Sequence, residues 1–197
     1  MEKIILASAS PRRKEILEAV GIPFEVVRSD ADESSISAEC GAHVYVQELA
    51  LLKASAAAKK LKDKKRENML IVAADTVVVS EGEILGKPAD EEDAFAMLSH
   101  LSGKTHEVIT GICVFRLDDA FSVCDSVVTR VSFKKLSADM INEYIDTKEP
   151  MDKAGAYGIQ GRGALLCERI EGDYFNVVGL PVSRLWDILR TEFGCVL

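Results

Sequence analysis

The first twenty residues change from a short apolar run to a helical pattern of apolar positions. Residues 3–7 form a mainly apolar run with β-branched members, which is too short for a helix and predicts a strand. A helix is expected to follow, with Ser10 at the N-cap, Pro11 at the first helical position and Gly21 as a left-handed stop. Its apolar face is formed by Ile16, Leu17 and Val20.

Helical spacing of apolar residues returns over residues 43–61. Before it, residues 24–28 predict a second strand, and the polar, acidic stretch 29–42 predicts a surface loop. The helix over 43–61 is rich in alanine and is expected to end in the solvated charge run 59–67. We expect its buried face to consist of Val44, Leu49, Leu52 and Ala56.

The rest of the chain alternates apolar segments with turn and cap signals. Residues 69–79, a Glu-Gly-Glu turn and residues 84–88 predict two strands joined in a hairpin. The other expected elements are a helix over 90–101 ended by Gly103, a hairpin of strands over 106–116 and 121–133, a helix over 137–146, a glycine-rich loop over 154–164, a strand over 165–170 and a helix over 181–191 with Leu185, Ile188 and Leu189 inward. This order predicts a mixed α/β fold whose twisted, partly antiparallel sheet is flanked by helices.

Composition and charge narrow the class of protein. The 197 residues are 48% hydrophobic and 28% charged, which is typical of one globular domain over 1–197. The formal net charge of −8, from 24 Lys and Arg against 32 Asp and Glu, argues against binding a nucleic-acid polymer or an anionic membrane. We see no apolar run long enough to span a bilayer and no signal peptide, so a cytoplasmic location is expected. Five scattered cysteines without a C-x-x-C pair predict incidental thiols.

Two serines and two arginines stand where the first strand gives way to the first helix. A helix N-terminus presents unpaired N–H groups and the positive end of its dipole, which attracts an anion. Ser8 and Ser10 add hydroxyl donors, and Arg12 and Arg13 add charge with the forked geometry that suits phosphate oxygens. The alternative is an ordinary serine cap with solvated arginines.

Asp75 interrupts an apolar strand, where a carboxylate is unfavourable unless a partner or a cavity lies beside it. A catalytic base or a metal ligand has both features, and a turn-capping carboxylate is the alternative. Glu33, in the acidic loop, is a weaker candidate because such loops are usually solvated.

Two lysines and the glycine-rich loop complete the candidates. Lys53 sits among Leu and Ala in its helix and Lys87 precedes a proline; each could bind an anion, or could be an ordinary surface charge. The four glycines of the loop would allow its backbone to approach a flat ligand, with Tyr157 to pack against it and Gln160 to read hydrogen-bonding edges.

Taken together, these segments resemble the Maf proteins, nucleoside triphosphate pyrophosphatases related in fold to the inosine triphosphatases. The resemblance is carried, in the order of the family, by the stretches LASASPRRKEIL, AADTVVV, GKP, LSGKTHEVITG, DKAGAYGIQG and VVGLP between residues 4 and 181. It implies a fold with a central cleft, hydrolysis of a nucleoside triphosphate to the monophosphate and pyrophosphate, and a requirement for a divalent cation such as Mg²⁺, Mn²⁺ or Co²⁺. A homodimer is expected on the resemblance alone.

The resemblance also implies roles for single residues. Asp75 would be the proton acceptor, and Glu33 with Asp75 would hold the metal. The triphosphate would be held by Ser8, Arg13, Lys53 and Lys87.

Substrate choice is implied by three further positions. The branch of the family that acts on 7-methyl-GTP has an aromatic residue, Gln and Glu where this chain has Arg12, Thr76 and Gln160, so the chain is similar to the branch acting on dTTP, UTP and modified pyrimidine nucleotides. A nucleotide-binding regulator of cell division or septum formation is the alternative, and it would not need the base Asp75. A dinucleotide-binding oxidoreductase is disfavoured because no G-x-G-x-x-G links a strand to a helix.

Overall fold

The computed structural model describes residues 2–61 and 68–196, so residues 62–67 of the predicted charge run lie outside the described part. The chain forms two compact units, each assembled from separate segments. Unit 1 comprises Met1–Asp75, Thr110–Val127 and Gly179–Leu197, and unit 2 comprises Thr76–Ile109 and Val128–Val178. The expectation of one domain over 1–197 is not tested by this division and stays a prediction.

Among the described residues, seven strands form a mixed sheet in the order β2-β1-β3-β5-β6-β7, with β4 paired to β3. The strands are β1 (Lys3–Leu6), β2 (Phe24–Val26), β3 (Met69–Ser80), β4 (Glu83–Leu85), β5 (Thr105–Arg116), β6 (Ser122–Phe133) and β7 (Cys167–Glu171). β1 pairs in parallel with β2 and β3, whereas β3 with β4 and β6 with β7 are antiparallel. The predicted fold class, a mixed and partly antiparallel sheet with helices, is confirmed.

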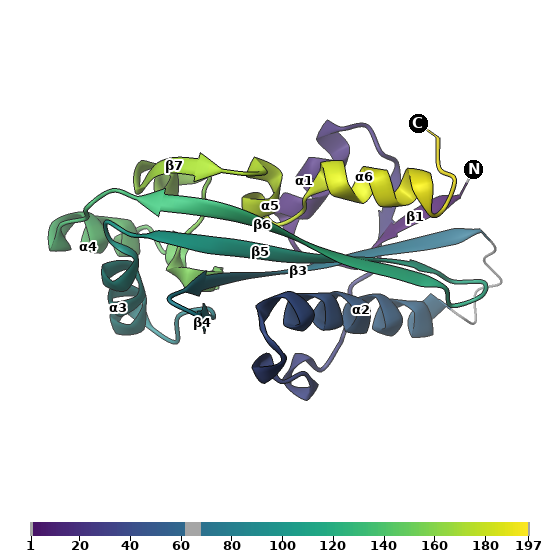
Figure 1. Ribbon diagram of the computed structural model, residues 1–197, viewed down its shortest axis with the longest axis horizontal. Coiled ribbons are helices and arrows are strands. Elements are labelled where there is room, and N and C mark those ends of the chain that lie inside the picture. Colours follow the sequence, from purple (N-terminus) through teal and green to yellow (C-terminus); the bar gives the residue numbers. More distant parts are fainter. Residues whose placement is uncertain (1, 62–67, 197) are drawn as a thin grey trace. The chain divides into compact units, whose positions relative to one another are not determined.

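Unit 1 contains α1 (Pro11–Ala19), α2 (Ala42–Leu61) and α6 (Val182–Thr191), with α2 on one face of its strands and α1 and α6 on the other (Figure 1). Successive side chains of a strand point to opposite faces, so Ile5, Ile71 and Ala73 share one face. That face packs against the alanines of α2 in one core cluster. Asp75, two positions beyond Ala73, continues the face toward α2.

The helix over 43–61 is confirmed, but of the four residues predicted on its buried face only Leu49 is buried. Val44 is 46% exposed, and Leu52 and Ala56 are only partly buried. The buried positions are Val46, Leu49, Ala50, Ala54, Ala57, Ala58 and Leu61. Alanine is small enough to be buried or exposed on a helix, so the periodicity of this segment does not determine which side is buried. Close packing on the sheet determines it.

Unit 2 contains α3 (Glu91–Leu101), α4 (Ala138–Asp146) and α5 (Tyr174–Val178), together with the 3₁₀ turns η4 (Glu149–Asp152), η5 (Ala154–Ala156) and η6 (Gly161–Leu165). The predicted caps are confirmed: the Asp90 side chain accepts from the backbone N–H of Asp93, and Ser137 accepts from Met140. These helices form a hydrophobic core with the C-terminal ends of β3 and β6 and the N-terminal end of β5.

Several local expectations need correction. Ser10 occupies the N-cap position of α1 but its side chain makes no capping hydrogen bond; its backbone N–H instead donates to the Ser8 hydroxyl. Leu165 belongs to η6 rather than to β7, and α5 was not predicted because it is only five residues long. No helix of residues 2–61 and 68–196 has the length and apolarity needed to cross a bilayer.

Candidate active site

The junction of β1 and α1 gathers hydroxyl and guanidinium groups. The Ser8 side chain is buried, and its Oγ accepts hydrogen bonds from the backbone N–H of Ser10 at 3.1 Å and from Nη1 of Arg13 at 3.3 Å. Arg13 also donates from Nε to the backbone carbonyl of Gly179 at 2.8 Å. The turn that the sequence predicted as an anion site therefore holds an oriented arginine.

Neighbouring charges of the same unit act on the pKa of Arg13. Burial lowers the pKa of its guanidinium, and the neighbouring Asp75 raises this pKa. The adjacent charge of Arg12 lowers it and that of Glu33 raises it. An arginine keeps its proton in proteins, so these effects locate a permanent positive charge within electrostatic reach of both carboxylates.

Lys53 joins the two predicted carboxylates. Its Nζ lies 2.5 Å from Oδ1 of Asp75 and 3.0 Å from Oε1 of Glu33. The side chains of Lys53 and Asp75 are only 12% and 14% exposed, whereas that of Glu33 is 53% exposed. Asp75 is thus a largely buried carboxylate with a cationic partner, which is the condition that makes such a group tolerable in an apolar strand.

The local sequence explains why these side chains meet. Lys53 occupies the buried face of α2, between Leu49 and Ala57, so its stem runs along the apolar surface and its ammonium reaches the strand. Asp75 stands on the face of β3 that packs against this helix. Glu33 begins η1 (Glu33–Ser35), a short turn in the predicted acidic loop, and reaches Lys53 from there.

Tyr45 is a neighbour of the site that the sequence reasoning missed. Burial raises the pKa of its hydroxyl, and the negative charges of Asp75 and Glu33 raise it further. Tyr45 and Lys53 are eight positions apart, hence on the same side of α2. The spacing of Tyr45 from Lys53 along the helix could therefore have indicated, from the sequence, that Tyr45 lies near the site.

Of the other predicted site residues, Arg12 lies in α1 of unit 1 and is partly exposed, whereas Thr76, Lys87 and Gln160 lie in unit 2. Thr76 follows Asp75 in β3 and is partly exposed, and Lys87 and Gln160 are exposed. The segment before Lys87 is held against the glycine-rich loop, because the backbone N–H of Gly155 donates to the carbonyl of Gly86 at 2.9 Å. The part of these three residues in a site with the unit 1 group stays a prediction.

The expectation that Tyr157 packs against a ligand is wrong. Its ring is buried in the core of unit 2, edge-on to Phe133 and His106, and its hydroxyl lies 2.7 Å from Nε2 of His106. A large aromatic residue in a glycine-rich loop is as well suited to anchor that loop in a core as to stack on a ligand.

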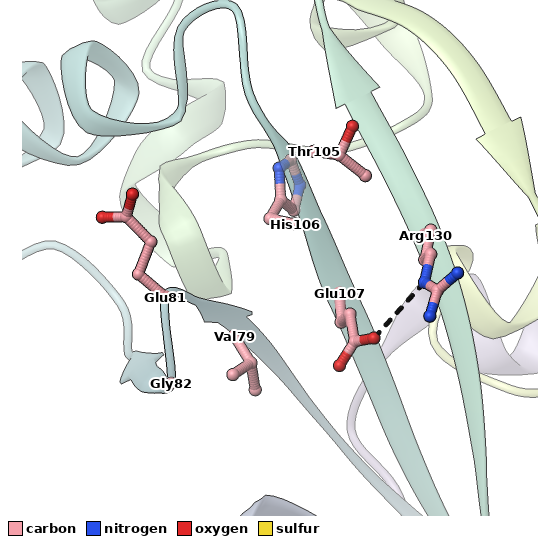
Figure 2. A pocket seen from close by; sticks show the side chains of 7 residues that line it. All are labelled: Val79, Glu81, Gly82, Thr105, His106, Glu107 and Arg130. Atoms are coloured by element: carbon pink, nitrogen blue, oxygen red, sulfur yellow. Dashed lines mark hydrogen bonds and ion pairs between the residues drawn. The ribbon is translucent and has the colours of Figure 1, made fainter.

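Unit 2 also carries a hollow of about 290 Å³ that contains none of the predicted site residues. It is lined by Val79, Glu81, Gly82, Thr105, His106, Glu107 and Arg130 (Figure 2). Arg130 and Glu107 pair across neighbouring strands, at 3.5 Å between Nε and Oε1, and Glu81 pairs with Lys104. The mixed, mutually paired charges do not define a site for one kind of ion.

Glu33 and Asp75 have the chemistry of ligands for a small divalent cation. Mg²⁺ is usually held by one or two carboxylates together with waters and substrate phosphates, and does not need a cage made entirely of protein. In the described part of the chain, no three His, Cys, Asp or Glu side chains gather as a complete metal site. Two carboxylates around one lysine therefore fit a cation that arrives with a phosphate ligand.

Fold and site together define an α/β protein in which a largely buried carboxylate, Asp75, contacts Lys53 and lies in the same unit as the oriented Arg13. The chain belongs to the Maf-like protein family, whose family model matches residues 3–192. This confirms the resemblance drawn from the motifs.

The chain is similar to curated members of that family over nearly its whole length. It is 54% identical, over 98% of this chain and 96% of the relative, to the dTTP/UTP pyrophosphatase of Acetivibrio thermocellus. It is 51% identical, over 98% of this chain and 90% of the relative, to the dTTP/UTP pyrophosphatase of Caldanaerobacter subterraneus subsp. tengcongensis. Among solved structures it is similar to the Staphylococcus aureus Ham1 protein, with a TM-score of 0.47 and 18% identity over 67% of this chain and 72% of that one.

Proposed function

We propose that this protein hydrolyses dTTP, UTP and modified pyrimidine nucleoside triphosphates to the monophosphate and pyrophosphate. Hydrolysis of a nucleoside triphosphate follows from its close relation to curated dTTP/UTP pyrophosphatases. The observation that carries the finer mechanism is Asp75: a carboxylate 14% exposed, in an apolar strand, held by Lys53 and within electrostatic reach of Arg13.

The cationic groups are assigned to the phosphates. A triphosphate carries about four negative charges, and Ser8, Arg13, Lys53 and Lys87 would hold it through charge-assisted hydrogen bonds. Lys53 would exchange part of its contact with the carboxylates for a phosphate oxygen when substrate binds. The helix N-terminus behind Ser8 adds its dipole to the same charge.

Asp75 is assigned the role of general base. It would orient a water molecule and take its proton as the water oxygen bonds to the α-phosphorus. The bond between the α-phosphorus and the bridging oxygen to the β-phosphorus then breaks, and its electron pair leaves with pyrophosphate. The nucleoside monophosphate keeps the oxygen that came from water.

Glu33 and Asp75 are the residues that would hold a divalent cation, Mg²⁺, Mn²⁺ or Co²⁺. When bound, such a cation neutralises phosphate charge and makes water a stronger acid. On the other side of the substrate, Arg12, Thr76 and Gln160 would face the base, where a pyrimidine offers the O2 acceptor, the N3–H donor and the O4 acceptor.

Hydrolysis in H₂¹⁸O tests both the reaction and the point of attack. With UTP and Mg²⁺, we expect UMP and pyrophosphate as primary products, with one ¹⁸O in UMP and none in pyrophosphate by mass spectrometry. Label in pyrophosphate would mean attack at the β-phosphorus, and UDP with labelled orthophosphate would mean attack at the γ-phosphorus; either result contradicts the mechanism. Tight nucleotide binding without turnover would favour the regulator instead.

A further inference from the structure

Two of the groups that hold Arg13 come from distant parts of unit 1. Its Nε donates to the carbonyl of Gly179, 166 residues further along the chain, at 2.8 Å, and its Nη1 donates to Ser8 at 3.3 Å. Because the guanidinium is planar, contacts at two of its nitrogens determine both its position and the direction of its plane. Gly179 is not among the residues that the sequence assigned to the site.

The backbone of Gly179 has a conformation that favours glycine. Its φ is 121°, in the positive region that residues with a Cβ rarely adopt. The next residue, Leu180, is fully buried and precedes the start of α6, so the peptide that carries the accepting carbonyl is fixed at its far end. The carbonyl is therefore a rigid acceptor whose direction depends on the glycine.

This contact opposes a competing attraction. The negative charges of Asp75 and Glu33 both act on the Arg13 guanidinium. An arginine side chain released from Gly179 would be drawn toward these carboxylates, where it would compete with Lys53 for Asp75 instead of binding a phosphate. A fixed neutral acceptor prevents this collapse without adding a third negative charge to an anion-binding site.

We propose that Gly179 is a positioning residue, whose carbonyl holds Arg13 in the orientation that binds the phosphates. The inference rests on the proposed function in so far as Arg13 is assigned to the triphosphate. It gives the glycine of the VVGLP stretch a physical task within the site, which it performs through Arg13.

The test is a double-mutant cycle of Gly179→Ala and Arg13→Lys, read out by calorimetric titration with inorganic pyrophosphate in Mg²⁺ buffer. Each single variant should lose about 10- to 100-fold in affinity, the range for a hydrogen bond to a charged group. The double variant should bind no more weakly than Arg13→Lys, because both changes remove the same oriented group. Losses that multiply in the double variant would mean that Gly179 acts independently of Arg13, and would overturn the inference.

Gly194→Ala is the matched control. Gly194 also has a positive φ, of 68°, and lies in the same C-terminal segment, with nothing within 4 Å of an added Cβ. It carries the backbone strain without a neighbour to disturb, so it should keep wild-type affinity for pyrophosphate. A loss equal to that of Gly179→Ala would attribute the effect to general destabilisation and reject the proposal.

The contact between Arg13 and Gly179 can also be tested in the wild-type protein, so that the result does not depend on whether a Gly179 variant folds. The ¹⁵N NMR signal of the Arg13 Nε–H, identified by its absence in Arg13→Lys, should exchange with water more slowly than that of Arg12. Equal exchange would show that the bond to Gly179 is not kept in solution. If instead the bond is protected but the wild-type protein releases no pyrophosphate from any nucleoside triphosphate, the proposed function fails while the contact stands.

Discussion

The substitution Gly111→Ala tests whether the position of α2 controls the site. Gly111 lies in β5, beneath the N-terminal half of α2. A Cβ built on it would lie 2.3 Å from both the carbonyl carbon and the oxygen of Val46, and 2.7 Å from the backbone nitrogen of Gln47. All three atoms belong to the helix backbone, so no side-chain rotation can relieve the overlap.

The size of the effect follows from these distances. Ordinary contacts begin at about 3.4 Å, so the helix backbone must retreat by about 1 Å. Overpacking of this kind costs about 1–3 kcal/mol, which for a chain of this length lowers Tm by roughly 2–12 °C. Because α2 carries Lys53, the same displacement moves Nζ relative to Asp75, and a misplacement of about 1 Å in a catalytic group can reduce turnover by about 100-fold.

The assay combines thermal unfolding with kcat/KM for UTP. Gly86→Ala is the control for stability, since an added Cβ there meets nothing within 4 Å and Gly86 has no positive φ; its Tm should stay within about 2 °C of wild type. If Gly111→Ala unfolds at the wild-type temperature and keeps wild-type activity, the close approach of helix and strand does not position Lys53.

Three further predictions concern the base, the substrate and the core. Asp75→Asn should reduce kcat by about 10²–10⁴-fold with the fold intact; activity above a tenth of wild type would remove Asp75 from the mechanism. Arg12→Ala and Gln160→Ala should alter the kcat/KM ratios among UTP, dTTP, CTP and GTP, whereas Arg13→Ala should lower all four alike; unchanged ratios in both base-side variants would refute their assignment. Burial lowers the pKa of His106 to about 4, so the unfolded chain, with a pKa near 6.5, takes up the proton first and stability falls as the pH drops from 6.5 to 4. At about 1.4 kcal/mol per pKa unit this amounts to about 3 kcal/mol, and urea unfolding of wild type and His106→Phe should show the smaller pH dependence in the variant.

The sequence predicted best those features that depend on local chemistry. The end of the first strand near Ser8, the stop at Gly21 and the caps Asp90 and Ser137 each rest on one residue and its immediate neighbours, and all were confirmed. Asp75 could also be identified from the sequence as a candidate site residue, because an isolated carboxylate in a run of β-branched residues has few structural explanations.

What the sequence could not predict depends on packing between distant segments. Three of the four residues predicted on the buried face of α2 are not buried, because the face was decided where the backbone of Val46 and Gln47 approaches Gly111 in a distant strand. The buried Asn176 of α5 donates to the carbonyl of Val108 and to the Thr129 hydroxyl, and no periodicity distinguishes such an asparagine from a surface residue. Tyr157 became a core residue because of a partner, His106, that lies 51 positions earlier.

The origin of unit 1 from three separated segments has a consequence for synthesis on the ribosome. Asp75 and Lys53 are made early, but the carbonyl that orients Arg13 belongs to the last segment, Gly179–Leu197. Domains emerge from the ribosome N-terminus first, and contacts of long sequence separation form late. A nascent chain that lacks this segment therefore carries Asp75 and Lys53 without the contact that orients Arg13. On the proposed function, such a chain would bind the triphosphate poorly until Gly179–Leu197 has been added and has folded.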